Sequence, residues 1–269
     1  MSDIVAIILL GIVEGVTEFL PISSTGHLIL AGALLGYDPA YWELFNIAIQ
    51  PGAILAIVAL YWRTVWTVAK GAVRGDAGAW RFIRNVAVAF LPAALVGVVL
   101  HDAIEALLGR ADIVCWALII GGIAILAIER VARPGEVRGI ADIPLATAIG
   151  IGCIQCIALV PGVSRSAATI LGALLLGVER RTAAEFSFFL GLPTLTAATL
   201  YQLYRHREAL AAGGGVGLGG IALGAAVSFV VALVVVRWFI GIVGKRGFAP
   251  FAWYRIVIGG AALAWLLAR

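Results

Sequence analysis

Apolar residues occur along this chain in long runs, and six of these runs are long enough to cross a lipid bilayer as helices. A spanning helix needs about 20 apolar residues, because each residue advances the helix axis by about 1.5 Å. The pattern therefore predicts spanning helices at six places, which are roughly 44–62, 84–104, 112–130, 185–205, 216–242 and 250–268.

Two further apolar regions, roughly 4–36 and 143–177, are interrupted by polar residues and proline. The interruption reads Glu-Phe-Leu-Pro-Ile-Ser-Ser-Thr-Gly-His at 18–27 and Pro-Gly-Val-Ser-Arg-Ser at 161–166. Broken backbone is tolerated at membrane depth only where protein or a polar cavity satisfies its N–H and C=O groups. We expect each region to form a re-entrant hairpin of two half-helices.

The composition agrees with a membrane protein. Apolar residues make up 62% of the 269 positions and charged residues 13%, whereas average proteins have about 45–50% and about 25%. So few polar residues exclude a soluble or disordered protein, a disulfide-stapled module and a nucleic-acid-binding domain. We expect a single all-α domain over residues 1–269, which lies among membrane lipids and has no nucleic-acid partner.

Basic residues support the same arrangement, because Lys and Arg accumulate in cytoplasmic loops. When loop 63–84 is placed in the cytoplasm, fourteen of the 19 Lys and Arg residues fall on that side and four on the other. The remaining one, Arg165, falls in the second interruption. This threading places the N-terminus outside, so the first hairpin enters from the outside and the second from the inside.

The two halves of the chain, approximately 1–140 and 141–269, resemble each other when shifted by 141 residues. The matched pairs include Gly11 and Gly152, Glu14 and Gln155, Ser23 and Ser164, Thr25 and Ser166, and Phe45 and Phe186. Because the hairpins enter from opposite faces, we expect an inverted-topology repeat. Such repeats bring their broken helices face to face near the midplane, where polar ligands bind. The two hairpin tips are therefore expected to touch.

Two carboxylates, Glu14 and Glu18, lie four residues apart, which stacks them on one face of the first half-helix. A charge at membrane depth costs roughly 2.5–3.5 kcal/mol even on the lenient insertion scale, so adjacent acids need a cation, a proton or a polar cavity. This pattern favours a metal site or an acid/base pair. The alternative is that both acids merely pair with Arg165.

A run of hydroxyls follows Pro21, which ends the first half-helix. Ser23, Ser24 and Thr25 stand where the second half-helix should begin, and hydroxyls beside free N–H groups at a positive helix end suit a phosphate. His27 lies three residues after Ser24, near enough on one helix face to act as its base or to attack directly. Ser24 and His27 are therefore catalytic candidates, although capping alone would explain one hydroxyl.

The second tip offers a cation. Arg165 lies between Ser164 and Ser166, just after Pro161-Gly162 and again at an expected helix start. A guanidinium binds phosphate through two parallel hydrogen bonds and keeps its proton, so Arg165 is expected to clamp an oxyanion together with the two serines. An ion pair with a glutamate of the first hairpin is the alternative, and the two roles can coexist.

The segments 14–27 and 161–166 closely resemble the two signature motifs of the undecaprenyl-diphosphate phosphatase family, also called bacitracin resistance proteins. The resemblance extends over nearly the whole chain and includes Tyr254-Arg255-Ile256. It implies a phosphatase of the bacterial plasma membrane that removes the terminal phosphate of undecaprenyl diphosphate and recycles this lipid carrier for cell-wall synthesis. It also implies dependence on a divalent cation, Mg²⁺ or Ca²⁺, and a site that opens to the extracytoplasmic side.

By position, the family's catalytic carboxylates fall on Glu14 and Glu18, and these would hold the cation. Its serine and histidine fall on Ser24 and His27, and its phosphate-binding arginine falls on Arg165. The expected reaction is attack on the terminal phosphorus while Glu18 or His27 takes the proton of Ser24 and Arg165 stabilises the developing charge. The sequence leaves open whether Ser24 or His27 is the nucleophile.

A transporter of prenyl phosphate or another anion is the alternative function, because the same inverted repeat serves alternating access. It explains less well why two acids, a serine and a histidine share one hairpin. The sequence also leaves a homodimer open.

Overall fold

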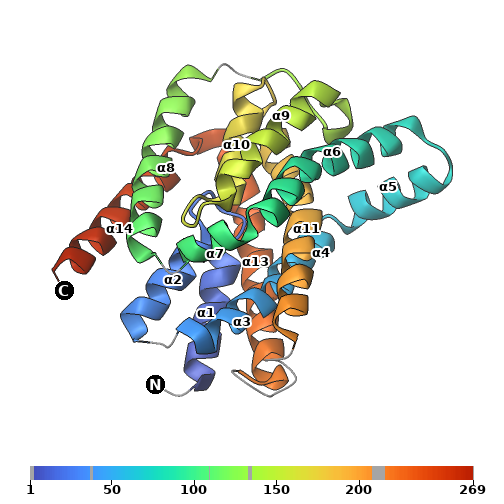
Figure 1. Ribbon diagram of the computed structural model, residues 1–269. Coiled ribbons are helices and arrows are strands. Elements are labelled where there is room, and N and C mark those ends of the chain that lie inside the picture. The colour runs from blue at the N-terminus through green and yellow to red at the C-terminus, as the bar shows by residue number, and fades with distance from the viewer. Residues whose placement is uncertain (1–2, 37–38, 109, 133–134, 208–215, 269) are drawn as a thin grey trace.

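The computed structural model describes residues 3–36, 39–108, 110–132, 135–207 and 216–268. Throughout these ranges the chain forms helices and turns without a β-strand, apart from an isolated bridge between Val137 and Val178. The helices pack into one bundle (Figure 1). The expectation of an all-α protein is confirmed for the described residues.

Five helices in the described ranges are long and apolar enough to cross a membrane, at five of the six places that the hydrophobic pattern predicted. They are α6 (Ala77–Val99), α8 (Ala111–Val131), α11 (Arg180–Arg205), α13 (Leu218–Arg246) and α14 (Ala249–Leu267). Large apolar side chains on these helices, among them Leu95, Ile120 and Val234, are more than half exposed. Such apolar surface is typical of contact with lipid tails.

The sixth predicted span, 44–62, is interrupted and bent. This part of the chain forms α3 (Pro39–Ala48), α4 (Gln50–Leu60) and α5 (Trp62–Val73). Pro51 lies in the first turn of α4, where a proline begins a helix but cannot continue one from the preceding residues. The axis then bends by 76° between Leu44–Leu60 and Trp62–Val73, and the described residues hold six candidate spans if this bent pair counts as one.

Both interrupted regions fold as helices separated by a break, where the polar residues predicted it. The first pair is α1 (Asp3–Thr17) and α2 (Ser24–Leu35), and the second is α9 (Leu145–Gln155), extended by the 3-10 turn η2 (Cys156–Leu159), and α10 (Arg165–Leu175). The shorter elements α7 (His101–Leu108) and η1 (Ile140–Asp142) lie between α6 and α9 in the chain. Below, residues 18–24 are the first tip and residues 160–165 the second tip.

The second helix of each pair starts with the same serine cap. Ser23 Oγ accepts a hydrogen bond from the Gly26 N–H (3.3 Å), and Ser164 Oγ accepts one from the Ala167 N–H (3.1 Å). These bonds satisfy N–H groups that the first turn of a helix leaves unpaired. The two tips therefore share a serine cap, although Ser23 has φ +74° and Ser164 has φ −71°.

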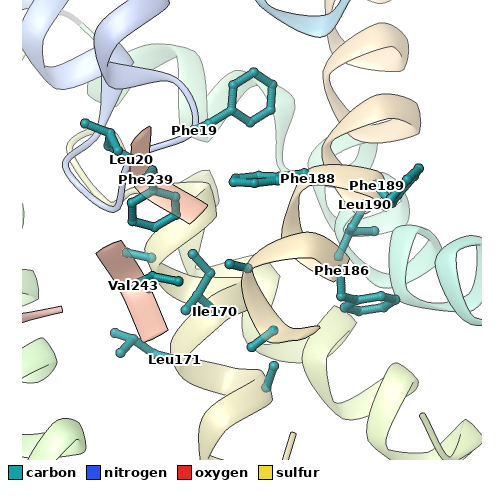
Figure 2. Packing of buried hydrophobic residues seen from close by; sticks show 14 of the residues in the cluster. Phe19, Leu20, Ile170, Leu171, Phe186, Phe188, Phe189, Leu190, Phe239 and Val243 are labelled. Carbon is teal, nitrogen blue, oxygen red and sulfur yellow. The ribbon is translucent and has the colours of Figure 1, made fainter. Parts of the chain in front are cut away.

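The first tip is fixed in the apolar core. The rings of Phe19 and Phe188 of α11 meet edge to face with centroids 5.4 Å apart, and Phe188 lies 6.0 Å from Phe239 of α13. Figure 2 shows these rings beside Ile170 and Leu171 of α10. Aromatic side chains contribute large apolar areas and favour edge-to-face contacts. This packing holds the first tip against the second hairpin and two long helices.

Arg255 of α14 joins both tips to α8. Its side chain is fully buried, and its guanidinium donates hydrogen bonds to the carbonyl groups of Pro21 (3.2 Å), Gly162 (3.2 Å), Ala117 (2.9 Å) and Leu118 (3.3 Å). The carbonyls of Pro21 and Gly162 belong to the breaks, where no helical N–H is available to them. The guanidinium of Arg255 thus pairs with carbonyl groups of both tips that have no helical partner.

We expect Arg255→Met to lower the stability of the fold without adding bulk. Loss of several charge-assisted bonds leaves buried carbonyls unpaired and should cost about 3 kcal/mol, which lowers the thermal midpoint by roughly 6–10 °C. The measurement is thermal unfolding of the detergent-purified protein, with Arg237→Met at an exposed site of α13 as the matched control. Equal midpoints for the two variants would contradict the joining role of Arg255.

Candidate functional site

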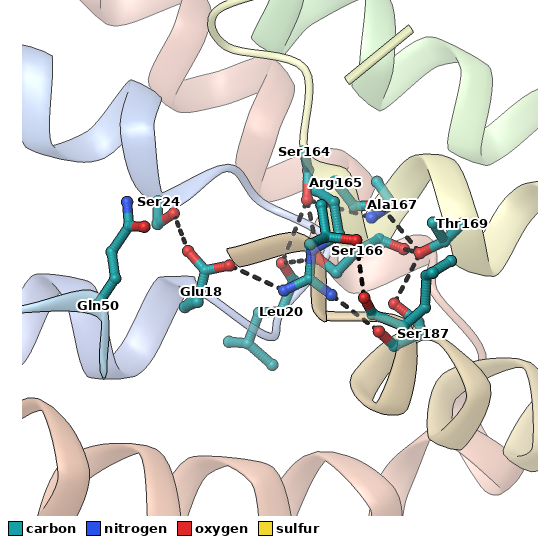
Figure 3. Close-up of polar contacts among 12 residues, drawn as sticks. Glu18, Leu20, Ser24, Gln50, Ser164, Arg165, Ser166, Ala167, Thr169 and Ser187 are labelled. Atoms are coloured by element: carbon teal, nitrogen blue, oxygen red, sulfur yellow. Dashed lines mark hydrogen bonds and ion pairs between the residues drawn. The ribbon is translucent and has the colours of Figure 1, made fainter. Parts of the chain in front are cut away.

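The two tips meet through Glu18 at the end of the first half-helix. Arg165 Nη2 donates a hydrogen bond to Glu18 Oε1 (2.9 Å), and Ser24 Oγ donates one to Glu18 Oε2 (Figure 3). The side chains of Glu18 and Arg165 are 4% and 11% exposed, so this ion pair is almost completely removed from solvent. The contact expected between the hairpins is therefore present, although 147 residues separate Glu18 from Arg165.

The guanidinium of Arg165 is held in place from several sides. Its Nη1 donates to the Ser187 carbonyl of α11 (2.9 Å), and its carbon lies 5.5 Å from the centre of the Phe19 ring. Thr169 Oγ1 donates to the Arg165 carbonyl (2.9 Å) and lies 2.7 Å from Ser187 Oγ. Gly191 leaves room for the guanidinium, because a Cβ there would lie 2.7 Å from Nη1. Arg165 is thus fixed with Nη2 directed at Glu18.

Ser164 and Ser166, expected to bind phosphate, have hydroxyls that contact the first tip. Ser166 Oγ donates to the Leu20 carbonyl (2.6 Å), Ser164 Oγ lies 3.4 Å from the same oxygen, and the two hydroxyls are 2.9 Å apart. Both side chains are buried. In this arrangement the serines hold the two tips together.

The first tip contains an unusual backbone conformation. Ser23 has φ +74° and is the one non-glycine residue with positive φ among those described. This region costs an L-residue roughly 1–3 kcal/mol and persists where surrounding contacts enforce it. Ser23 turns the chain just before Ser24, so that Ser24 begins α2 with its hydroxyl on Glu18, while the side chain of Thr25 is exposed.

His27 lies one turn into α2, and its ring bonds to the Ser23 carbonyl and to Tyr254, not to Ser24. Nδ1 is 2.7 Å from the Ser23 carbonyl, which can only accept, so Nδ1 carries the hydrogen. Nε2 is 2.9 Å from the hydroxyl of Tyr254 on α14, and the two rings stack with centroids 5.5 Å apart. Both ring nitrogens are engaged, and the hydroxyl of Ser24 bonds to Glu18.

Glu14 is the most unusual charged side chain of the site. It is fully buried, and neither carboxylate oxygen has a hydrogen-bond partner within the part of the chain that the structure describes. Glu14 lies one turn before Glu18 on α1, since the Glu18 N–H bonds to the Glu14 carbonyl (3.0 Å). A buried carboxylate without partners is costly, and two acids spaced by one turn supply the hard oxygen ligands that Mg²⁺ and Ca²⁺ prefer. The donor set therefore fits a divalent cation.

Three residues that the sequence did not single out for function join the site, and Ser187 does so through its backbone carbonyl. Tyr254 reaches His27, Ser187 supports Arg165, and Gln50 at the start of α4 points toward Ser24 in Figure 3. The Gln50 amide is oriented by Thr199 of α11, whose hydroxyl donates to its oxygen (3.3 Å). The one signal for Gln50 is an amide beside Pro51 within an apolar run, and it does not identify a partner.

Comparison with known proteins gives consistent results. The family model described as Bacitracin resistance protein BacA matches residues 7–261. The chain is 58% identical to an undecaprenyl-diphosphatase of Novosphingobium aromaticivorans over 100% of both chains. It is 56% identical to an undecaprenyl-diphosphatase of Sphingopyxis alaskensis over 99% of each chain. It is also 48% identical to undecaprenyl-diphosphatase 2 of Paramagnetospirillum magneticum, with 97% of this chain and 98% of the relative covered.

Proposed function

The chain belongs to the family of the bacitracin resistance protein BacA, and from this membership we propose that its two tips form the catalytic site of an undecaprenyl-diphosphatase. The activity is that of a membrane phosphatase, which converts undecaprenyl diphosphate into undecaprenyl phosphate and inorganic phosphate and so recycles the lipid carrier. The location of this chemistry in the fold and the roles of the residues are our proposal.

One observation supports the location above all others. A carboxylate, a hydroxyl and a guanidinium from the two tips are bonded to one another in an almost dry part of a membrane protein. Polar and ionisable groups at membrane depth are expensive and mark functional sites. A serine hydroxyl bonded to a carboxylate is a nucleophile beside a base, which phosphoryl transfer uses and alternating access does not require.

Ser24 is the nucleophile in this proposal, and Glu18 is its base. Ser24 Oγ forms a bond to the terminal phosphorus as its proton passes to Glu18, and the bridging P–O bond breaks to release undecaprenyl phosphate. Water then attacks the phosphorus of the phosphoserine, the Oγ–P bond breaks, Glu18 returns its proton to Ser24 Oγ, and inorganic phosphate leaves with the oxygen of the water. Arg165 neutralises the charge that develops on the phosphoryl oxygens in both steps.

The starts of α2 and α10 complete the phosphate site. Both helices begin beside Glu18, because their first residues are Ser24 and Arg165. Helix N-termini present free N–H groups and a partial positive charge, which favour a bound phosphate. The exposed side chain of Thr25 would contribute its hydroxyl to the substrate, and Ser23, Ser164 and Ser166 shape the site through their caps and contacts.

Glu14 and Glu18 would hold the divalent cation, Mg²⁺ or Ca²⁺. When bound, the cation supplies positive charge that offsets the negative charge of the diphosphate. Glu14 has both oxygens available for it, whereas Glu18 shares its oxygens between Ser24 and Arg165. Glu14 is thus assigned to the cation and Glu18 chiefly to proton transfer.

We also propose how the helices are arranged in the membrane. The bent pair would form the sixth span, and the two helix pairs would be re-entrant hairpins of an inverted repeat with halves near 1–140 and 141–269. The matching serine caps at Ser23 and Ser164 support this repeat, as does the excess of basic residues in loops on one side. The protein would lie in the bacterial plasma membrane with its site open to the extracytoplasmic side.

One chain supplies every group of this mechanism, so the chemistry does not require a homodimer.

The direct test is phosphate release from undecaprenyl diphosphate by detergent-purified protein, because transport needs a sealed compartment and hydrolysis does not. We expect the wild-type protein to release phosphate and Ser24→Ala to lose roughly a thousandfold in kcat while remaining folded. Ser228→Ala, at a buried serine of α13, is the matched control and should keep its activity. An acid-stable phosphoserine at Ser24 would confirm the nucleophile, and an acid-labile phosphohistidine or an active Ser24→Ala would contradict it.

Glu14→Gln tests the cation site, because it removes charge and keeps shape. We expect the cation concentration for half-maximal activity to rise at least about tenfold while the KM for the lipid changes less than about threefold. Calorimetric titration with Mg²⁺ and Ca²⁺ provides a readout independent of turnover. Asp112→Asn, at an exposed carboxylate of α8, is the control, and unchanged cation binding by Glu14→Gln would remove Glu14 from the metal site.

A further inference from the structure

Tyr254 and His27 form a chain of contacts that ends on the backbone just before the nucleophile. We propose that both are positioning residues: Tyr254 orients the His27 ring, and His27 holds the Ser23 carbonyl so that Ser24 faces Glu18. The inference rests on the proposed function, since it assigns the proton of Ser24 to Glu18. It gives a role to Tyr254 and takes acid–base chemistry away from His27.

The Ser23 carbonyl receives two hydrogen bonds from the same residue. The backbone N–H of His27 donates to it at 3.2 Å and the ring Nδ1–H at 2.7 Å. Ser23 is also the residue with φ +74°, a conformation that needs enforcement by its surroundings. The side chain of His27 thus holds the carbonyl of the strained residue Ser23, and this carbonyl belongs to the peptide group that leads into Ser24.

Tyr254 contacts the ring nitrogen of His27 that carries no hydrogen when Nδ1 donates to the Ser23 carbonyl. Its hydroxyl lies 2.9 Å from Nε2, and the parallel rings, 6° apart in orientation, fix the plane of the imidazole. When Tyr254 donates to Nε2, the neutral ring keeps its hydrogen on Nδ1 and directs it to Ser23. A partner that sets the tautomer of a histidine is a recurrent device for orienting it.

The same turn of α14 thereby holds the first tip at two places. Arg255 bonds to the Pro21 carbonyl, and its neighbour Tyr254 acts on Ser23 through His27. These contacts lie on either side of the short stretch that turns the chain toward Ser24. Residues of α14 thus position the backbone of the first tip, whereas the carboxylate that accepts the proton, Glu18, belongs to the tip itself.

Three variants at position 27 separate a positioning role from a catalytic one. His27→Asn keeps an N–H donor close to the place of Nδ1 and has no basic nitrogen, His27→Gln places its amide near Nε2, and His27→Ala has neither. We expect His27→Asn to keep at least about a third of the wild-type kcat for phosphate release, and the other two to lose about thirtyfold or more. Any series in which His27→Asn is not the most active variant overturns the proposal, as does near-normal activity of all three.

Tyr254→Phe keeps the stacked ring and removes the hydroxyl. We expect kcat to fall about three- to tenfold, with the KM for undecaprenyl diphosphate changed less than about twofold. The same substitution in the His27→Asn background should have no further effect, because the acceptor Nε2 is already absent. Equal losses in both backgrounds, or no loss in either, would overturn the chain of contacts. Tyr204→Phe, at an exposed tyrosine of α11, is the matched control.

Wild type and Ser24→Ala are measured in parallel, so that failure of this inference is distinguishable from failure of the proposed function. A wild-type protein without phosphate release overturns both. An active wild type, an inactive Ser24→Ala and a position-27 series in the wrong order overturn the positioning role alone. Thermal midpoints close to that of the wild type for His27→Gln and His27→Ala show that their losses arise in a folded protein.

Discussion

An ion pair between Glu18 and Arg165, almost completely removed from solvent, is the contact on which the site depends. Two buried charges are tolerated because each neutralises the other, and removal of one partner of a buried pair typically costs about 3–5 kcal/mol. The remaining bonds of this pair go to Ser24 and to the Ser187 carbonyl. The pair therefore stabilises the meeting of the tips and at the same time sets the nucleophile beside its base.

The two tips both carry a serine cap and differ in chemistry. With a shift of 141 residues, Ser24 corresponds to Arg165, and each is the first residue of a helix with a serine cap. Gln50 corresponds in the same way to Gly191, where only the absence of a side chain leaves room for the Arg165 guanidinium. A site at the junction of the two tips can combine a nucleophile from one with a cation from the other, which neither tip holds alone.

Much of this organisation could be predicted from sequence, because its signals are local. Pro21 and Ser23 indicated where the first pair breaks, and opposite entry of two broken hairpins predicted that their tips meet. The partners of His27 could not be predicted in this way. Its spacing from Ser24 suggested a pair, but Tyr254 follows 227 residues later and its contact depends on how α14 packs.

Hydrogen bonds from side chains to backbone carbonyl groups could not be predicted from the sequence either. Arg255 bonds to carbonyl groups, which every residue has, so no side-chain pattern indicates these partners. Ser164 and Ser166 likewise resemble phosphate ligands in sequence, while their hydroxyls lie on the Leu20 carbonyl in the structure. Side chains that bond to the unpaired carbonyl groups of the helix breaks can thus be identified only from the three-dimensional structure.

If the two tips act as one catalytic unit, the effects of Glu18→Gln and Arg165→Lys should not be independent, which a double-mutant cycle measures. The quantity to measure is kcat/KM for phosphate release by each single variant and by the double variant, with folding verified by thermal unfolding. If the groups share one phosphate, the double variant should lose no more than about threefold beyond the worse single variant. Losses that multiply would show that Glu18 and Arg165 act independently and would contradict a shared site.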